Sequence, residues 1–174
     1  MAIQRVLNPG IAAGIAAAVI LSLASLISQA NNPPVYELRR KPGADVYRAR
    51  TSEHPHDESF PSLLILRTEG RIYFGNAQRV ADKMAPIVRE ARPEVVIVDC
   101  GAVPDIEFTA LKMLIEAEER LRTNGIQLWL ARLNPAALEV VQRSSLGQSL
   151  GRERMFFNVH GAVETYLAGQ TAAD

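Results

Sequence analysis

The sequence has 174 residues with 19 basic and 19 acidic side chains, and Cys100 is its single cysteine. This length suffices for one domain with its own hydrophobic core and little more. The balanced charge argues against a nucleic-acid partner, which would call for a basic excess, and a single cysteine excludes a disulfide framework within the chain.

The N-terminal part of the chain is uncharged and apolar. No charged residue lies between Arg5 and Glu37, and the centre of this segment is Gly10–Ser28. Its length is close to the roughly 20 residues that cross a bilayer as a helix. A GxxxG pair at its start suits close packing against other membrane helices. We therefore expect one transmembrane helix within residues 1–32.

The charges around this segment predict its orientation. Basic residues follow it at positions 39–41, whereas Arg5 alone precedes it. The positive-inside bias then places residues 31–174 in the cytoplasm and the span in the inner (cytoplasmic) membrane. The run at 39–41 is either this topology signal alone or also a contact with anionic lipid headgroups.

Two other interpretations of the apolar segment exist. One is a secretory signal with a small-x-small cleavage site at residues 28–30, and the other is a buried helix of a soluble protein. The apolar stretch is longer than the usual signal core of about 7–15 residues. The length and the flanking charges both favour a span.

After residue 33 the chain alternates between strand and helix signals. We expect strands at 35–38, 63–67, 72–74, 95–98 and 126–133. We expect helices at 77–91 and 106–122, a short helix from Pro135, and a last helix at 159–167. Loops are predicted at 51–62 and 146–157.

Local signals indicate how these elements begin and end. The turn Glu69-Gly70 predicts a hairpin between the second and third strands. Asn76 and Asn134 are expected to cap the helices that follow them. Asn124-Gly125 is expected to end the preceding helix with a left-handed residue.

These elements predict an α/β fold. Two successive strand–helix units imply a parallel core with right-handed crossovers, and the expected hairpin adds antiparallel pairing. The helices are too few to cover both faces, so we expect a mixed β-sheet with helices mainly on one face, preceded by one transmembrane helix. The predicted organisation is a transmembrane helix with its flanks at 1–32, one cytoplasmic domain at 33–168 and a disordered tail at 169–174.

The stretch VVIVDCGAVPDIEFTALKML is where chemistry is expected. A buried strand there leads into a polar loop at a helix start, the place where α/β proteins bind ligands. Cys100 and Thr109 are nucleophile candidates, and the nearby acids are Asp99, Asp105 and Glu107. Turn and capping roles also explain the aspartates, and burial explains the cysteine. No glycine-rich phosphate-binding motif is present, so we predict no enzyme and no catalytic residue.

The sequence HPHDE, His54 to Glu58, contains nitrogen and carboxylate groups of the kind that bind metals. Its two histidines flank a proline, and no cysteine or third histidine lies near them. A solvated loop is the better interpretation, so we predict no metal and no cofactor.

Three stretches together resemble a known family. They are VVIVDCGAVPDIEFTALKML, LLILRTEGRIYFGNAQRV and ALEVVQRSSLGQSLGRERMFFNVHGAV. In combination they resemble the STAS domain at the cytoplasmic C-terminus of SulP-type (sulfate permease type) anion transporters, over roughly residues 33–168. The resemblance implies a STAS-like fold with a regulatory role, and it makes the apolar segment similar to the last membrane helix of such a permease.

The resemblance also implies which residues regulate. In the anti-sigma-factor antagonists of this family the loop carries Asp-Ser-Ser-Gly, and its second serine is phosphorylated. The matching residues here are Glu107, Phe108, Thr109 and Ala110. Thr109 keeps a hydroxyl at the phosphoacceptor place, while Phe108 and Ala110 depart from the pattern. The implied partner- or anion-binding loop consists of Asp99, Cys100, Gly101, Asp105 and Glu107.

The partners follow from the same resemblance. They are the membrane part of a permease and the lipid bilayer, with a nucleotide or an anion at the loop and a homodimer formed through the transporter. One span cannot form an alternating-access site, so the chain alone is not expected to transport an anion. A fragment, a subunit of a split transporter and a tethered regulator all fit the sequence, which does not encode the transported anion. The alternative function is a free-standing partner-switching protein like the anti-sigma-factor antagonists.

Overall fold

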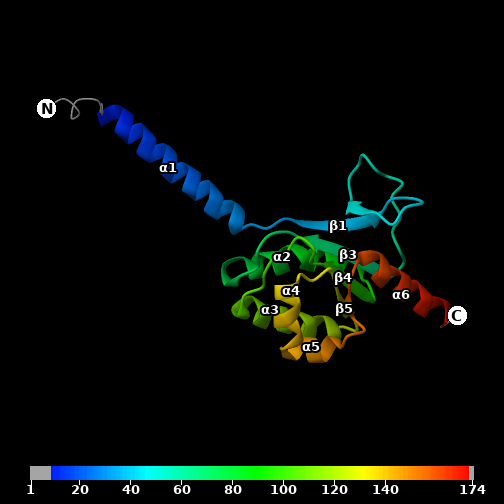
Figure 1. Cartoon of the computed structure of the whole chain (residues 1–174). Coiled ribbons are helices and arrows are strands. Elements are labelled where there is room, and N and C mark those ends of the chain that lie inside the picture. The colour runs from blue at the N-terminus through cyan, green and yellow to red at the C-terminus, as the bar shows by residue number, and fades with distance from the viewer. Residues whose placement is uncertain (1–8, 173–174) are drawn as a thin grey trace. The chain divides into compact units, whose positions relative to one another are not determined.

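A computed structural model describes residues 9–172 (Figure 1). The chain divides into two compact units between Asn32 and Pro33. The start of the expected N-terminal flank, including Arg5, and the last two residues of the expected tail lie outside the described residues.

The first unit is one helix, α1 (Pro9–Ala30), which contains no charged side chain. Within it lies the apolar segment Gly10–Ala30, whose most apolar window of 18 residues has a mean hydropathy of 2.3, and the residues of this segment are exposed. At about 1.5 Å per residue this segment is about 30 Å long, the thickness of the hydrocarbon core of a bilayer. By length and composition α1 is therefore able to cross a membrane.

The second unit contains a sheet and the remaining helices. Its strands are β1 (Val35–Arg40), β2 (Tyr47–Ala49), β3 (Leu63–Thr68), β4 (Val95–Asp99), β5 (Gln127–Ala131) and β6 (Met155–Phe156). Its helices are α2 (Phe74–Ala91), α3 (Phe108–Thr123), α4 (Pro135–Gln142), α5 (Ser145–Leu150) and α6 (Val159–Thr171).

The strands form one mixed sheet in the order β2-β1-β3-β4-β5-β6. From β3 to β6 neighbouring strands are parallel, whereas β1 runs antiparallel to both β2 and β3. All five residues of β4 are buried because this strand lies in the middle, between β3 and β5. The predictions of a mixed sheet and of a two-sided central strand are confirmed.

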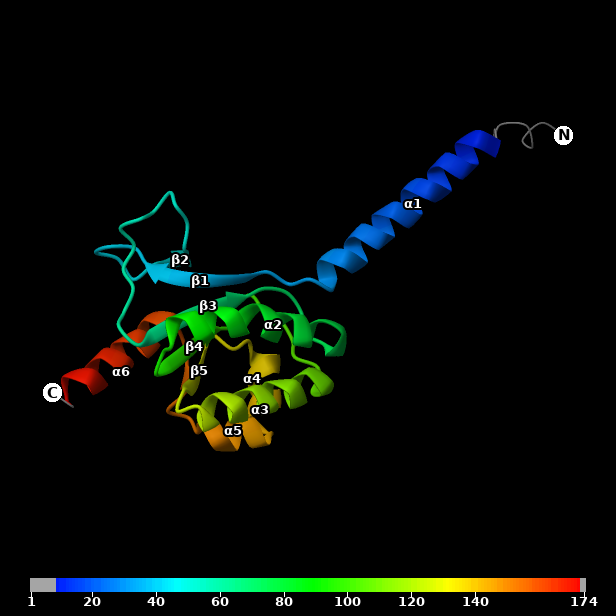
Figure 2. The ribbon, with the colours of Figure 1, turned by 180° about the vertical axis from the view of Figure 1, so that it is seen from behind.

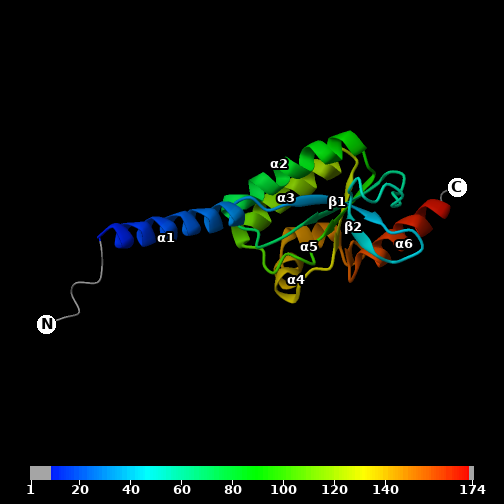
Figure 3. The same ribbon diagram turned by 90° about the horizontal axis from the view of Figure 1, so that it is seen from above.

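Alternate residues of the central strands contribute to two hydrophobic clusters, one on each face of the sheet. On the first face α2, α3, α4 and α5 cover residues such as Leu66 and Val98. On the second face α6 is the one helix, among those that the structure describes, that packs against residues such as Ile65 and Ile97. Figure 2 shows α2 and α3 on the near side, and in Figure 3 α6 lies across the sheet from them. The prediction of helices mainly on one face is confirmed.

The predicted hairpin after β3 is wrong. Ile72 forms only an isolated parallel bridge to Ile106, and helix α2 already begins at Phe74. Gly70 turns with a positive φ of 87°, and its N–H donates to the carbonyl of Ala102, 2.9 Å away. The chain after the turn therefore pairs with the loop that follows β4. The hairpin in this sheet is formed by β1 and β2, and β2 is too short and polar to give a sequence signal.

Asn76 stabilises the start of α2 from a different position than predicted. Tyr73 is the residue that precedes the helix, and Asn76 lies in its first turn, fully buried. Its Oδ1 accepts from the Tyr73 N–H at 3.0 Å, and its Nδ2 donates to the Arg71 carbonyl at 2.8 Å. The amide closes the first turn, as in a capping box, so the helix starts before Asn76.

The C-terminal part contains more regular structure than predicted. The segment 146–157, expected as a loop, contains most of α5 and all of β6. Leu146 and Leu150 on α5 are buried in the first cluster, because an i, i+4 pair shares one helix face. Helix α6 continues through Thr171, so residues 169–171, expected in a disordered tail, are helical.

Candidate functional site

The predicted site lies at the carboxyl ends of the parallel strands. Arg67 of β3, Asp99 of β4 and Ala131 of β5 are neighbours in register there. In open α/β sheets ligands bind outside this edge. The structure places the predicted loop residues at this edge but divides them between the two faces of the sheet.

Asp99 points to the face that α6 covers, and its side chain is fully buried. Its Oδ2 accepts hydrogen bonds from Nε and Nη2 of Arg67, at 2.9 and 2.7 Å. Its Oδ1 accepts from the Gly101 N–H at 3.0 Å and lies 3.2 Å from Nε of Arg132. A buried carboxylate is tolerated only with such partners. Asp99 is therefore an anchor that joins three segments of chain.

Gly101 makes room for one of these partners. A Cβ at this position would occupy the space of the Arg132 guanidinium, so any larger residue would displace that side chain. Arg132 itself has a left-handed backbone conformation with a φ of 59°, which is uncommon for a residue other than glycine. The Arg132 side chain therefore lies so close to the backbone at position 101 that only glycine fits there.

Cys100 points to the opposite face, into the first hydrophobic cluster. Burial, together with the negative charge of Asp99, raises the pKa of its thiol from 9.0 to about 12. The nucleophile and metal ligand in cysteine chemistry is the thiolate, which such a pKa suppresses at neutral pH. The geometry supports the interpretation of Cys100 as a small buried residue.

Asp105 and Glu107 lie at the end of the loop after β4, directly before α3. Both face Arg71, whose Nη2 is 2.9 Å from Asp105 and 3.5 Å from Glu107. Glu107 is the residue that precedes α3, and its side chain makes no capping hydrogen bond. Two carboxylates thus share one arginine at this helix start.

Asn134 has a role in the same loop that the sequence did not reveal. It precedes α4, as predicted, but its side chain makes no capping hydrogen bond there. Its Nδ2 instead donates to the carbonyl of Val103, at 2.7 Å. Asn134 therefore ties the loop after β4 to the loop after β5.

Thr109 is exposed in the first turn of α3, where backbone N–H groups have no partner within the helix. Phe108 beside it is 73% exposed. Phe74, which begins the neighbouring helix α2, is 71% exposed, and both helices leave from the bridged pair Ile72 and Ile106. Two helices that pack against each other thus each begin with an exposed phenylalanine. Sequence reasoning missed Phe74, because it expected this residue in a strand at 72–74 and not at the start of α2.

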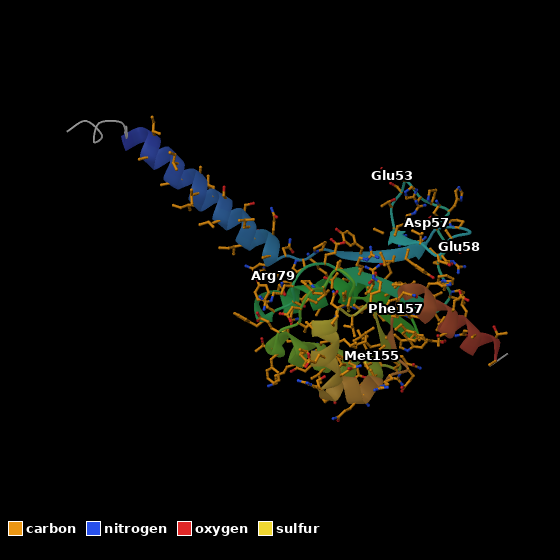
Figure 4. The ribbon with its side chains drawn as sticks, viewed as in Figure 1. Glu53, Asp57, Glu58, Arg79, Met155 and Phe157 are labelled. Carbon is orange, nitrogen blue, oxygen red and sulfur yellow. The ribbon has the colours of Figure 1, made fainter. Side chains whose placement is uncertain are left out.

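The acidic loop before β3 is held by arginines. Asp57 is buried, and both its oxygens accept from Arg48 at 2.7 Å, which lowers the pKa of its carboxyl group. Glu58 accepts from Arg40 at 2.7 Å, beside β1 (Figure 4). In the described part of the chain no group of three or more His, Cys, Asp or Glu side chains is placed to hold a metal ion. Arg40, one of the basic residues at 39–41, is thus engaged within the domain.

The fold defines the class: a STAS-like α/β domain whose loop after β4 lies at the carboxyl edge of the sheet. The family model of the STAS domain matches residues 54–162, and the chain belongs to this family. It fits the STAS region of a SulP-type transporter.

Relatives with curated names are sulfate transporters. High affinity sulfate transporter 2 of Stylosanthes hamata is 29% identical over 163 residues, which cover 88% of this chain and 24% of that protein. The chain thus spans about a quarter of the length of such relatives.

Solved structures share the fold. The murine Solute Carrier 26 family member A9 anion transporter matches with a TM-score of 0.76 and 17% identity, over 89% of this chain and 25% of that one. The anti-sigma factor antagonist SpoIIAA in its unphosphorylated form matches with a TM-score of 0.52 and 12% identity, over 64% of this chain and 93% of that one. Both functional classes considered from the sequence therefore have this fold.

Proposed function

We propose that the chain is the regulatory STAS part of a SulP-type secondary anion transporter, with α1 as the last membrane helix of that transporter. The observation that carries the proposal is the junction, in one chain, of a STAS domain with a preceding apolar helix of 21 residues. The alignment with the plant sulfate transporter supports it. Residues 33–174 are about four-fifths of the chain, so an alignment that covers 88% extends into the apolar segment.

In this proposal α1 lies in the inner membrane and residues 31–174 lie in the cytoplasm. The substrate pathway belongs to the other membrane helices of the transporter, because a single span cannot form an alternating-access site. The domain modulates transport from the cytoplasmic side and does not transport by itself. Dimerisation through the transporter belongs to the same proposal.

The start of α3 is the surface we assign to a protein partner. Phe74 and Phe108 offer apolar area there, and Thr109 in the first turn of α3 offers an exposed hydroxyl whose modification would change the charge. Asp105 and Glu107 outnumber Arg71, so this helix start repels an anion more than an isolated helix end would. We therefore place the membrane part of the permease, rather than a free anion or nucleotide, on this surface.

The test uses a SulP-type permease body without its own STAS domain. Sulfate uptake is measured in cells that express this body alone, with the full chain, or with the chain carrying Phe74→Ser and Phe108→Ser. The double variant retains the sheet and both clusters, since neither phenylalanine belongs to them. We expect the chain to change uptake several-fold and the double variant to lose this effect. Equal uptake in all three at matched expression would rule out the regulatory role.

The alternative is a free-standing partner-switching protein. The fold is common to both classes, and α1 is the feature that favours the transporter. A reporter that is active only outside the cytoplasm, fused after Asp174, is expected to stay silent while the chain remains in the membrane fraction. Recovery of the chain in the soluble fraction would favour the partner-switching function.

A further inference from the structure

A cationic cluster lies on the second face of the sheet, beyond the part that α6 packs on. The hydrophobic cluster under α6 includes Ile65 of β3 and Ile97 of β4. Because residues alternate along a strand, Arg67 and Asp99 are the next side chains on this face. Arg132, just after β5, completes the cluster. Two guanidinium groups share one carboxylate, so the cluster carries one positive charge in excess.

Arg132 is the accessible member with unused hydrogen-bonding capacity. Its side chain is 43% exposed and forms an ion pair with Asp99, but it makes no hydrogen bond to any residue that the structure describes. A guanidinium has five N–H donors in a rigid fork. Arg67 is 21% exposed and uses only Nε and Nη2 toward Asp99. Both arginines therefore keep N–H donors beside the buried Asp99 carboxylate that Asp99 does not use.

The position of Arg132 is constrained rather than incidental. Its guanidinium lies in the space left by the missing side chain of Gly101, and its backbone N–H donates to the Phe156 carbonyl of β6 at 2.9 Å. The left-handed backbone of Arg132 persists only because these surroundings hold it, and such conformations gather at functional sites. These surroundings thus fix the Arg132 guanidinium at the edge of the sheet where α/β proteins bind ligands.

We propose that Arg132 and Arg67 form a binding site for a tetrahedral oxyanion. The ligand is a sulfate or phosphate ion, or the same group on a nucleotide, bound through paired N–H···O bonds of the kind that guanidinium makes with oxyanions. The site is separate from the start of α3, where two carboxylates face one arginine. It does not depend on the proposed transporter function.

Binding at this site is transmitted to the loop after β4. Asp99 accepts from the Gly101 N–H and pairs with Arg132 through the same oxygen, Oδ1. An oxyanion that competes with Oδ1 of Asp99 for the Arg132 guanidinium leaves this oxygen more fully to the Gly101 N–H. The amide of Gly101 therefore reports on occupancy without contacting the ligand.

The experiment follows the Gly101 amide and the arginine Nε–H resonances by NMR, using the full chain in a nonionic detergent. Sodium sulfate, sodium phosphate and ADP are added in separate titrations at constant ionic strength, balanced with sodium chloride. Matched variants are Arg132→Gln and Arg143→Gln, since Arg143 is exposed and, among residues 9–172, forms an ion pair only with Glu139 one turn away. The thermal midpoint of each variant checks that it is folded.

We expect saturable shifts of the Gly101 amide and of the Arg132 Nε–H, with one shared dissociation constant. Arg132→Gln should weaken binding at least about tenfold, because it removes the charge and the paired donors, while Arg143→Gln should bind like the parent. Tighter binding of ADP than of phosphate would identify a nucleotide ligand, and equal binding a free ion. Shifts that do not saturate, or that persist in a folded Arg132→Gln variant, would overturn the proposal. If that variant does not fold, an Arg132 Nε–H resonance of the parent that does not shift with any of the three anions would overturn the proposal.

Discussion

Replacing Asp99 by asparagine tests whether one buried carboxylate joins the carboxyl ends of the central strands. In the native protein both oxygens of Asp99 accept, from Arg67 and from the Gly101 N–H, and Arg132 adds an ion pair. Asparagine has nearly the same shape but no charge, and it offers an NH2 group where one oxygen accepts. The change therefore leaves two arginines without their counter-ion and one donor facing another.

The expected cost follows from the exposure of these groups. Removing one partner of a buried ion pair costs about 3–5 kcal/mol, because the other charge stays buried. Here the side chains of Arg67 and Arg132 keep 21% and 43% of their surface, so water relieves part of that cost. We expect Asp99→Asn to lower the free energy of unfolding by about 2–3 kcal/mol, or Tm by roughly 5–10 °C in a domain of this size.

The assay is thermal and urea unfolding of residues 33–174, followed by circular dichroism, since this unit contains the whole sheet and both hydrophobic clusters. Asp82→Asn is the control, because Asp82 is exposed on α2 and such changes stay within about 0.5 kcal/mol. An Asp99→Asn domain as stable as the control would refute the role of the carboxylate as an anchor.

Three further predictions concern the hydrophobic core, the thiol of Cys100 and the start of α3. Ile97→Asp should unfold the domain, because an unpaired carboxylate at a fully buried position of β4 costs several kcal/mol of the roughly 5–15 available; an unchanged Tm would contradict the central position of β4. Cys100 should resist thiol reagents at pH 8 in the folded domain. Folding raises the pKa of the Cys100 thiol from 9.0 to about 12, so its contribution to the free energy of unfolding should be complete below pH 9 and decline toward pH 12. A Cys100→Ala domain that loses as much stability between pH 9 and pH 12 as the parent would contradict this. Thr109→Glu should change sulfate uptake by the paired permease body while the Tm of the domain stays within a few degrees. Uptake equal to that of the parent and of Thr109→Ala, with no modification found by mass spectrometry, would show that Thr109 has no regulatory role and is only a hydroxyl at the start of a helix.

The sequence alone was enough for the elements whose signals are local. The uncharged run predicted α1, and the continuous apolar run at 95–98 predicted the buried middle strand, because burial on both faces requires apolar residues at every position. The loop after β4 was also recognisable, since a strand end followed by a helix start is a local pattern. Short elements gave no such signal: β2 has three residues and β6 two, too few for any periodicity to emerge.

The arrangement of the site was decided only by the tertiary structure. Asp99 was identified from its place in the chain, but its partners lie about thirty residues away on either side, Arg67 on β3 and Arg132 directly after β5. A charged residue within the apolar strand LLILR was the one sequence signal that could have pointed to Arg67. Strand register brings these residues together, and the alternation of side chains sends Asp99 and Cys100 to opposite faces. Register depends on the packing of the whole sheet, so a single sequence shows which residues are available for a site, while the folded sheet determines which of them meet.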